Sequence, residues 1–285
     1  MEKILDWVSL LRVRQWYKNL VVFLGIFFVR EFFLIDKLYL VILGFIALCL
    51  VSSAGYLIND VIDLKKDRLH PEKKNRPLAA GRISVILALV LAVVMFFMGS
   101  YLAFSLNQIF FYFVLALFFL TQIYSLILKN IVIADILSIA VLFVIRAISG
   151  AYLIQVKVSP WLILCPFFLS LFMSIGKRHA DLELLKENAG DARKVLKDYD
   201  LNLTNNLMII STTLLIISYS LYSFLSEHEN LLYTLPFGLY VIFRFFYLIN
   251  KGSIIARHPE KVIKDKAMII GILLWLIVTA LVIYR

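Results

Sequence analysis

Long apolar runs divide this chain of 285 residues, and they restrict its fold more than any other feature of the sequence. A helix needs roughly 20 apolar residues to cross the hydrocarbon core of a membrane. We therefore expect an all-α polytopic membrane protein with nine transmembrane helices, built as a single domain over residues 1–285. The runs fall at about 16–29, 38–58, 83–106, 109–128, 131–154, 161–175, 207–225, 231–249 and 267–284.

The composition excludes the other broad classes of protein. Hydrophobic residues make up 62% of the chain and charged residues 17%, whereas a soluble domain is about half apolar and about a quarter charged. Disordered chains are poor in apolar residues, so disorder is excluded as well. The two cysteines, Cys49 and Cys165, lie inside apolar runs, where a small buried side chain is the expected role. A disulfide scaffold is therefore excluded.

The net charge of +10 is distributed unevenly along the chain. If the amino terminus is cytoplasmic, the segments on that side carry 23 of the 29 lysines and arginines, and the segments on the other side carry four. The positive-inside rule favours this orientation. All three long loops, 59–82, 176–206 and 250–266, then lie in the cytoplasm. We expect an integral protein of the cell (inner) membrane whose active-site loops, 59–82 and 176–206, are cytoplasmic, and no cleavable signal peptide is evident.

The first long loop carries the strongest chemical signal. Asn59, Asp63 and Asp67 are four residues apart, so they share one face if the preceding helix continues. Two carboxylates and an amide form an oxygen surface of the kind that suits Mg²⁺, which binds one or two carboxylates together with substrate phosphates. Asp60 points about 100° away from this stripe and ranks lower as a ligand.

Cationic side chains follow the acidic stripe directly. Cations beside a metal site suit a diphosphate, because arginine can bind phosphate oxygens through two hydrogen bonds. An ordinary charged membrane loop would explain the lysines alone, but it would not explain the row of oxygen ligands. The cations and the histidine among them are Lys65, Lys66, Arg68, His70, Lys73, Lys74 and Arg76.

The acidic stripe and the residues that follow it resemble a motif of a known family. The stripe Asn59, Asp63 and Asp67, followed by Arg76-Pro77-Leu78 and Gly81, resembles the first aspartate-rich motif, N-x-x-x-D-x-x-x-D, of the UbiA-type membrane prenyltransferase superfamily. The resemblance covers essentially the whole chain. It implies nine transmembrane helices around a central cavity that opens toward the membrane, with Mg²⁺ ions that bind a diphosphate.

Further motifs resemble one branch of that superfamily, the decaprenyl-phosphate phosphoribosyltransferases. The run from Asp67 to Lys73 is similar to a D-R-x-H-P-x-K version of the motif, and the runs Tyr124–Lys129 with Asp135, Arg146–Gly150 and Gly176–Leu182 follow. The resemblance implies transfer of 5-phosphoribose from phosphoribosyl diphosphate to a polyprenyl phosphate. The product would feed synthesis of an arabinose donor for the cell envelope.

The sequence departs from the superfamily in its second motif. D-x-x-x-D is usual after the sixth span, whereas this chain has Asp181 and then Leu185. A second metal ion is therefore in question. Lys177 and Arg178 precede Asp181 and supply cations that would suit an extra phosphate, such as the 5-phosphate of the sugar.

The expected site divides into three groups of residues. Asn59, Asp63 and Asp67 are the predicted Mg²⁺ ligands, and Asp63, Asp67, Lys73 and Arg76 are the predicted catalytic residues. The remaining residues are predicted to bind substrate: Lys18, Asp60, Arg68, His70, Tyr124, Lys129, Asp135, Arg146, Lys177, Arg178 and Asp181.

Several of these residues have a simpler alternative role. Asp135 and Arg146 lie about three turns apart on one predicted span and could only fix helix packing. Tyr124 could be an interfacial anchor, and Lys18 an anchor for anionic lipid. Lys129 could be an ordinary positive-inside lysine, and His70, which precedes Pro71, could end a helix near Leu69.

Two other functions compete with the phosphoribosyltransferase. The nearer alternative is a UbiA-type prenyltransferase that moves a prenyl group from a prenyl diphosphate to an aromatic or lipid acceptor. A transporter would bury polar or broken-helix sites near the membrane midplane, whereas the polar residues here crowd one interface. Arg244 has no obvious partner, and Arg257, His258 and Lys261 are expected on a solvated surface. No nucleic-acid partner is expected, and prenyl chain length and oligomeric state stay open.

Overall fold

The computed structural model describes residues 2–69, 73–186, 189–228 and 230–285. These residues form α-helices and 3-10 helices joined by turns, with no strand in the described ranges. The chain divides into two compact units, each described separately below. Unit 1 comprises residues 1–127 and 145–158, and unit 2 comprises residues 128–144 and 159–285. Helix α7 (Ala134–Leu153) contributes its first half to unit 2 and its second half to unit 1.

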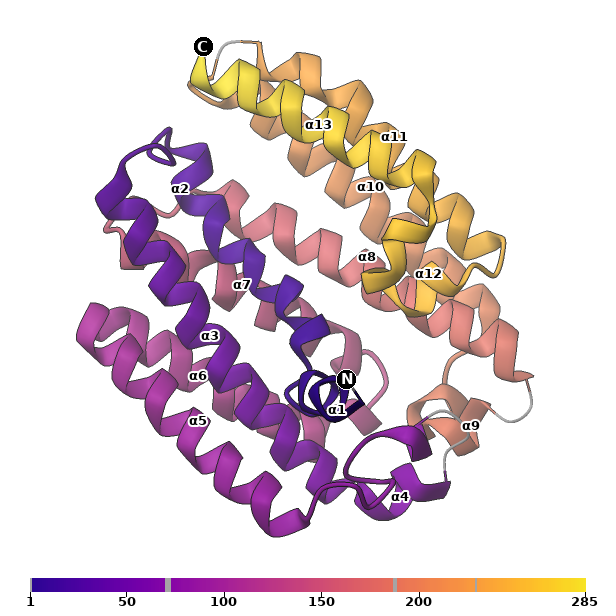
Figure 1. Ribbon diagram of the computed structural model, residues 1–285. Helices are drawn as coiled ribbons and strands as arrows, with labels where there is room; N and C mark the ends of the chain where they lie inside the picture. Colours follow the sequence, from indigo (N-terminus) through magenta and orange to yellow (C-terminus); the bar gives the residue numbers. More distant parts are fainter. Residues whose placement is uncertain (1, 70–72, 187–188, 229) are drawn as a thin grey trace. The chain divides into compact units, whose positions relative to one another are not determined.

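Unit 1 is built around helix α3, which packs against α5, α6 and η1 (Figure 1). Gly99 lets α5 approach α3 closely, since a Cβ atom there would lie 3.0 Å from the backbone oxygen of Ala47. Asn107 separates α5 from α6 and caps the second helix by accepting hydrogen bonds from the Ile109 and Phe110 amides. The elements are α1 (Glu2–Leu10), η1 (Val13–Phe23), α2 (Leu24–Phe28), α3 (Ile35–Ile62), α4 (Leu64–Leu69), η2 (Lys73–Asn75), α5 (Val85–Leu106) and α6 (Gln108–Leu126).

The first predicted span, 16–29, takes a different form from the others. Residues 13–28 form the 3-10 helix η1 and the short helix α2. Eleven residues of 3-10 helix rise about 22 Å, and five residues of α-helix rise about 7 Å. Together they match a hydrocarbon core of roughly 30 Å. The described ranges hold eight helices long and apolar enough to cross a membrane, so the count of nine is not confirmed and the first crossing stays a prediction.

Unit 2 contains two pairs of packed helices, α8 with α10 and α11 with α13 (Figure 1). Phe172, Met208 and Ile249 lie in its main apolar core. Side chains cap the helices, since Asp200 accepts a hydrogen bond from the Leu203 amide at the start of α10. The elements are η3 (Leu128–Asn130), α8 (Pro160–Leu185), α9 (Ala189–Ala192), η5 (Lys194–Lys197), α10 (Leu201–Leu225), η6 (Leu231–Thr234), α11 (Leu235–Asn250), α12 (Ile254–Arg257), η7 (Pro259–Lys264) and α13 (Lys266–Tyr284).

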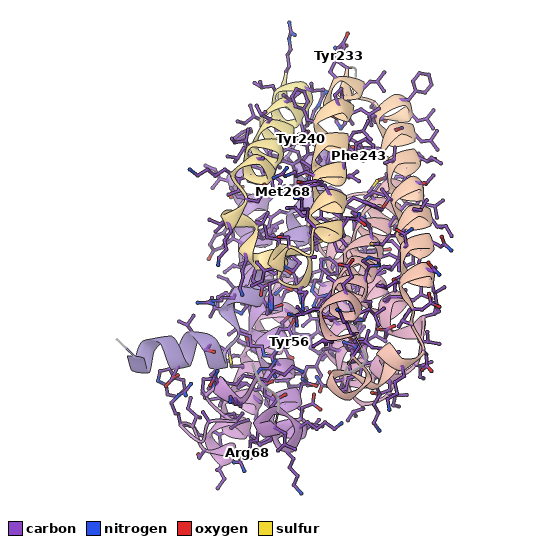
Figure 2. The ribbon with its side chains drawn as sticks, turned by 90° about the vertical axis from the view of Figure 1, so that its right-hand side faces the viewer. Tyr56, Arg68, Tyr233, Tyr240, Phe243 and Met268 are labelled. Atoms are coloured by element: carbon purple, nitrogen blue, oxygen red, sulfur yellow. The ribbon has the colours of Figure 1, made fainter. Side chains whose placement is uncertain are left out.

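Large apolar side chains cover much of the outer surface of both units. On α11 and the turn before it, Tyr233, Tyr240 and Phe243 are all exposed (Figure 2). A soluble protein rarely exposes such a large contiguous apolar surface, whereas a helix facing lipid needs one. The architecture is therefore that of an all-α membrane protein, as the sequence predicts.

Candidate functional site

The predicted stripe keeps its helical spacing even though the helix is interrupted. Helix α3 ends at Ile62 and α4 begins at Leu64. Across this break the Asp63 amide donates to the Asn59 carbonyl at 2.9 Å, and the Asp67 amide donates to the Asp63 carbonyl at 2.8 Å. Helix α4 extends to Leu69, the last described residue before the gap at 70–72, so the predicted helix end near Leu69 is not tested. Asn59, Asp63 and Asp67 therefore follow one another at one-turn intervals in unit 1.

Two carboxylates of this segment are buried and bound by arginines. Asp60 and Asp67 are 5% and 3% exposed. The Arg76 Nη1 atom donates to Asp60 Oδ1 at 3.0 Å and to Asp67 Oδ2 at 2.5 Å. Arg12, from the segment between α1 and η1, donates to Asp60 through both Nε and Nη2. Buried carboxylates need such partners, because an unpaired charge away from water is costly.

The donor set of the stripe fits a hard cation. The Asn59 Oδ1 atom is buried and accepts no hydrogen bond from the described part of the chain. Such an orphaned acceptor costs free energy unless a ligand satisfies it. In the described ranges no cluster of three or more acidic, histidine or cysteine side chains could hold a metal ion. Mg²⁺ fits an amide and two carboxylates, however, because substrate phosphates and water complete its coordination.

The cations after the stripe lie at different depths. The Lys73 Nζ atom lies 4.0 Å from Asp67 Oδ1, whereas Arg68 is exposed at the edge of unit 1 (Figure 2). Burial lowers the pKa of the Lys73 ammonium, against the opposing influence of Asp67. His70 lies outside the described residues, so its predicted role has no structural counterpart here. Lys73 and Arg76 are thus the cations placed beside Asp67.

A second polar group in unit 1 surrounds Arg146. The Arg146 Nε atom donates to Asn19 Oδ1 at 2.8 Å, and the Asn19 amide nitrogen lies 3.3 Å from the Cys49 sulfur. Tyr56 lies within electrostatic range of both Lys18 and Arg146. The predicted substrate residues Lys18 and Arg146 therefore belong to one polar group on neighbouring elements. Tyr124, near the carboxyl end of α6, is partly buried.

Asp135 is the centre of a buried polar cluster in unit 2. Its side chain is fully buried. The Arg178 Nε atom donates to Asp135 Oδ2 at 2.8 Å, and the Tyr199 hydroxyl donates to Asp135 Oδ1 at 2.7 Å. Arg193 lies farther away, with Nη2 at 3.4 Å from both Asp135 Oδ2 and the Lys129 carbonyl. These contacts join the start of α7, helix α8 and the segment 193–199.

The backbone beside Asp135 is strained. Ile133 has a φ of 67°, which is unfavourable for a β-branched residue. Its amide donates to the Tyr199 hydroxyl at 2.9 Å. Burial, followed by the hydrogen bond to Asp135, raises the pKa of the Tyr199 phenol, which stays protonated and can donate. Strained residues of this kind cluster at functional sites and persist where the surroundings fix them.

The predicted substrate-binding residues of α8 lie in different surroundings. Lys177 is exposed, whereas Arg178 is 2% exposed. Asp181 accepts a hydrogen bond from Arg257 Nε at 2.7 Å. Arg257 also lines an open hollow at the end of α8. Arg257 thus combines a position beside an open hollow with a charge pair to Asp181, a pairing that the sequence did not predict.

Sequence reasoning missed several residues of these clusters. Arg244 was expected to have no obvious partner, but its Nη2 atom donates to Asp265 Oδ2 at 2.8 Å. The partners of these residues are distant in the sequence, so no local motif reveals them. Only their polarity beside apolar runs could have drawn attention. The missed residues are Arg12 beside Asp60, Asn19 beside Arg146, Arg193 and Tyr199 beside Asp135, and Arg257 beside Asp181.

Comparisons of the sequence with known proteins agree on one family. Residues 19–257 match the model of the UbiA prenyltransferase family. The chain is 32% identical to a protein named decaprenyl-phosphate phosphoribosyltransferase from Mycolicibacterium smegmatis, over 94% of this chain and 89% of that protein. It is 29% identical to a protein of the same name from Corynebacterium glutamicum, over 97% of this chain and 86% of the relative.

Solved structures share the fold. A UbiA homolog from Archaeoglobus fulgidus, bound to GPP and Mg²⁺, superposes with a TM-score of 0.73 at 19% identity and covers 95% of this chain and 99% of its own. The same homolog bound to DMAPP and Mg²⁺ gives a TM-score of 0.72 at 18% identity. At this level of identity the likeness establishes the fold alone.

Proposed function

Because this chain belongs to the UbiA prenyltransferase family, we propose that it is a membrane phosphoribosyltransferase that acts on a polyprenyl phosphate. The protein is a transferase, as the relatives named above are. The proposed donor is phosphoribosyl diphosphate, and the proposed product is a polyprenylphosphoryl 5-phosphoribose. The product would be a lipid-linked pentose for arabinose donor synthesis in the cell envelope.

One observation carries the choice of substrates. The full-length similarity to proteins named decaprenyl-phosphate phosphoribosyltransferase, at 32% identity for the relative from Mycolicibacterium smegmatis, spans both units of the fold. The run Asp67-Arg68-Leu69-His70-Pro71-Glu72-Lys73 supports the same choice. By contrast, the solved neighbours bound to prenyl diphosphates are below 20% identical and support the fold.

The proposed reaction exchanges one bond at the sugar C1 atom. The bond between C1 and the diphosphate oxygen breaks, and a bond between C1 and an oxygen of the polyprenyl phosphate forms. Diphosphate leaves with the electron pair. The acceptor phosphate is already an anion at neutral pH, so it needs positioning more than deprotonation. This agrees with the chemistry of the clusters, whose charged groups are arginines, lysines and aspartates.

The residues of unit 1 are proposed to bind the diphosphate. Asn59, Asp63 and Asp67 would hold Mg²⁺, which supplies charge neutralisation on the leaving group when bound. Arg76 and Lys73, beside Asp67, would donate hydrogen bonds to diphosphate oxygens as negative charge grows there. Their positions next to the stripe support this assignment.

The polar residues elsewhere are proposed to bind the other phosphates. In unit 1 we assign Lys18, Arg68, Tyr124 and Arg146 to substrate. Asp60 of the motif segment contributes to substrate binding indirectly, through the arginines that it binds. In unit 2 we assign Lys129, Lys177 and Arg178 to the 5-phosphate, with Asp135 and Asp181 orienting arginines. The hydrogen bonds from Arg178 to Asp135 and from Arg257 to Asp181 support an orienting role for the two carboxylates.

A direct assay tests the proposal. Purified protein is incubated with Mg²⁺, labelled phosphoribosyl diphosphate and polyprenyl phosphate, and label is then measured in the lipid phase. We expect labelled lipid together with release of diphosphate. No labelled lipid, combined with transfer from a prenyl diphosphate to an aromatic acid or a lipid acceptor, would replace this proposal with the prenyltransferase alternative.

The location of the reaction is part of the proposal. The eight apolar helices of the described ranges, together with the family, identify an integral membrane protein. We propose that it lies in the cell (inner) membrane with its amino terminus and the loops 59–82 and 176–206 in the cytoplasm. The distribution of lysine and arginine supports this orientation. A soluble diphosphate donor made in the cytoplasm would then meet the site directly.

A further inference from the structure

Arg12 lies in an unusual backbone conformation at the entrance of the first predicted span. Its φ is 51° and its ψ is 41°, in the left-handed region. A residue with a side chain rarely adopts this conformation, which costs free energy and persists where other contacts fix it. A left-handed residue commonly closes a helix just after its end, and here the Arg12 amide donates to the Ser9 carbonyl at 3.2 Å. Glycine is the usual residue at such a position, so an arginine there is strained, and its side-chain contacts show what the position provides.

Those contacts all lead to helix α3. Arg12 Nε donates to Asp60 Oδ2 at 3.2 Å, and Nη2 donates to Asp60 Oδ1, so the guanidinium binds both carboxylate oxygens. The guanidinium also lies over the Tyr56 ring, 5.0 Å from its centroid. Burial is the largest single influence and opposes the charge, but the charge and hydrogen bond of Asp60, together with Tyr56 and Asp67, hold the pKa of Arg12 above its ordinary value. Arg12 is thus a fixed partner of Asp60.

Asp60 in turn holds the arginine of the motif loop. Arg76 Nη1 donates to Asp60 Oδ1 at 3.0 Å and to Asp67 Oδ2 at 2.5 Å. Asp60 directly follows Asn59 on α3, so it is fixed beside the first residue of the stripe. The two arginines occupy both of its oxygens. A continuous chain of charge-assisted hydrogen bonds therefore runs from Arg12 through Asp60 and Arg76 to Asp67.

We propose that Arg12 is a positioning residue for diphosphate binding, acting through Asp60 on Arg76. Arg12 neutralises the Asp60 carboxylate. Asp60 can therefore orient Arg76 without neutralising the positive charge of the Arg76 guanidinium. Arg76 can then present its remaining donors to phosphate oxygens beside Asp67. The proposal rests on the diphosphate site of the proposed function, but it holds for any diphosphate donor. It also assigns Asp60 to orientation of Arg76 and not to metal binding.

Three variants separate positioning from a purely structural role. Arg12→Gln leaves Asp60 buried with one cation fewer, so it should weaken binding and lower thermal stability. Arg12→Gln combined with Asp60→Asn removes both charges, so it should restore stability while binding stays weak. Arg12→Lys keeps the charge but loses the two-pronged geometry and should give intermediate binding.

The chain offers a matched control. Arg82 Nε donates to both Asp6 oxygens at 3.0 Å, which joins helix α1 to the end of the motif loop. This pair also ties the amino-terminal part of the chain to the region of the motif loop, but the Arg82 side chain is 46% exposed. Exposed ion pairs contribute little. Arg82→Gln should therefore leave diphosphate binding unchanged.

The measurement is calorimetric titration of the detergent-purified protein with inorganic diphosphate in the presence of Mg²⁺, alongside kcat and KM for the labelled donor. We expect Arg12→Gln to raise the Kd for diphosphate and the KM about tenfold, the size of effect that partners of directly binding groups give, with kcat within about twofold. Unchanged binding in Arg12→Gln would overturn the inference. So would a double variant that regains full binding together with its stability. Because inorganic diphosphate is the ligand in the titration, the test of Arg12 stays valid if phosphoribosyl diphosphate proves not to be the donor. That result would refute the proposed function and would leave the role of Arg12 unaffected.

Discussion

Asn59 carries a polar atom that the described fold leaves without a hydrogen-bond partner, and this makes it a sensitive probe of the metal site. Replacing an unsatisfied polar group by an apolar one costs little or stabilises. We expect Asn59→Leu to keep or slightly raise the unfolding temperature. Binding of diphosphate with Mg²⁺ should weaken at least tenfold, since partners of a metal site contribute about that much. Calorimetry and thermal unfolding of the same preparation check both parts.

Ser100 supplies the control for that experiment. Its hydroxyl is also buried and without a partner in the described ranges, but it lies on α5, outside the candidate site. Ser100→Ala should leave both stability and diphosphate binding near the wild-type values. If Asn59→Leu binds diphosphate as well as Ser100→Ala does, Asn59 is not a metal ligand.

Asp63 gives the most direct test of the stripe. It caps the end of α3 and lies one turn from both Asn59 and Asp67. We expect Asp63→Ala to lower activity at least a hundredfold, because electrostatic stabilisation of a leaving group is worth about that much, while the protein still inserts and folds. Asp36→Ala at the exposed, opposite end of the same helix should keep full activity. Retained activity in Asp63→Ala would remove the metal-site assignment.

At the residue scale, the sequence predicts groups whose partners are near in the chain. The four-residue spacing predicts the helical succession of Asn59, Asp63 and Asp67, which the backbone hydrogen bonds confirm. Arg12 could not be predicted in the same way, since its partner Asp60 is 48 residues away. The role of Arg193 likewise depends on a loop that folds back onto α7.

At the scale of elements, apolar length predicts helices well and their ends less well. Eight predicted spans correspond to helices that meet the criteria for crossing a membrane. Residues 13–28 differ because they form the 3-10 helix η1 and the short helix α2, and neither is long enough to cross a membrane by itself. Hydropathy alone does not distinguish these two helix types, because both satisfy their backbone hydrogen bonds internally.

Helix α13 begins at an ion pair whose pH dependence can be predicted. Asp265 Oδ1 accepts a hydrogen bond from the Met268 amide at 2.7 Å, and Asp265 Oδ2 accepts one from Arg244 at 2.8 Å. The hydrogen bond from Arg244 lowers the pKa of Asp265 in the folded state. The resulting stability is fully present above the unfolded-state pKa of about 3.9, and it is lost as pH falls through the lower folded-state value.

Thermal unfolding between pH 2.5 and pH 7 tests this prediction. We expect the unfolding temperature of the wild type to fall below about pH 4, and part of that fall should be missing in Asp265→Asn. Arg244→Gln should lose a similar part, because it removes the other half of the pair. If the unfolding temperatures of both variants fall with pH by as much as that of the wild type, the ion pair does not contribute to the pH dependence of stability.

The loop after α8 owes its position to Tyr199. The Tyr199 hydroxyl donates to Asp135 and accepts the Ile133 amide, so Tyr199→Phe leaves both groups with one partner fewer. Buried groups left unsatisfied cost about 1–3 kcal/mol. We expect a lower unfolding temperature and faster tryptic cleavage within the segment 193–197. Tyr101→Phe, at an exposed position on α5, should change neither, and equal cleavage in the two variants would contradict the anchoring role.

At the scale of the whole molecule, the side of the membrane on which the amino terminus lies depends on whether residues 13–28 cross the membrane. Contacts within unit 1 place the two ends of this segment along α3. Arg12 binds Asp60 near the carboxyl end of α3, and Phe23 packs against Phe45 nearer its middle, with ring centroids 5.8 Å apart. The segment therefore runs alongside α3 in the opposite direction. This arrangement and the length of the segment together favour a ninth crossing, with the amino terminus on the same side as the loop 59–82.

Cysteine labelling tests that arrangement directly. Ser9, Lys66 and Glu227 are exposed positions before the first crossing, in the motif segment and between α10 and α11. With nine crossings and the positive side in the cytoplasm, an impermeant maleimide added to intact cells should label Glu227→Cys, whereas Ser9→Cys and Lys66→Cys should react only after the membrane is opened. Labelling of Ser9→Cys together with Glu227→Cys in intact cells would mean eight crossings and would place Arg12 across the membrane from Asp60. Since their hydrogen bonds require one side, that result would also refute the role proposed for Arg12.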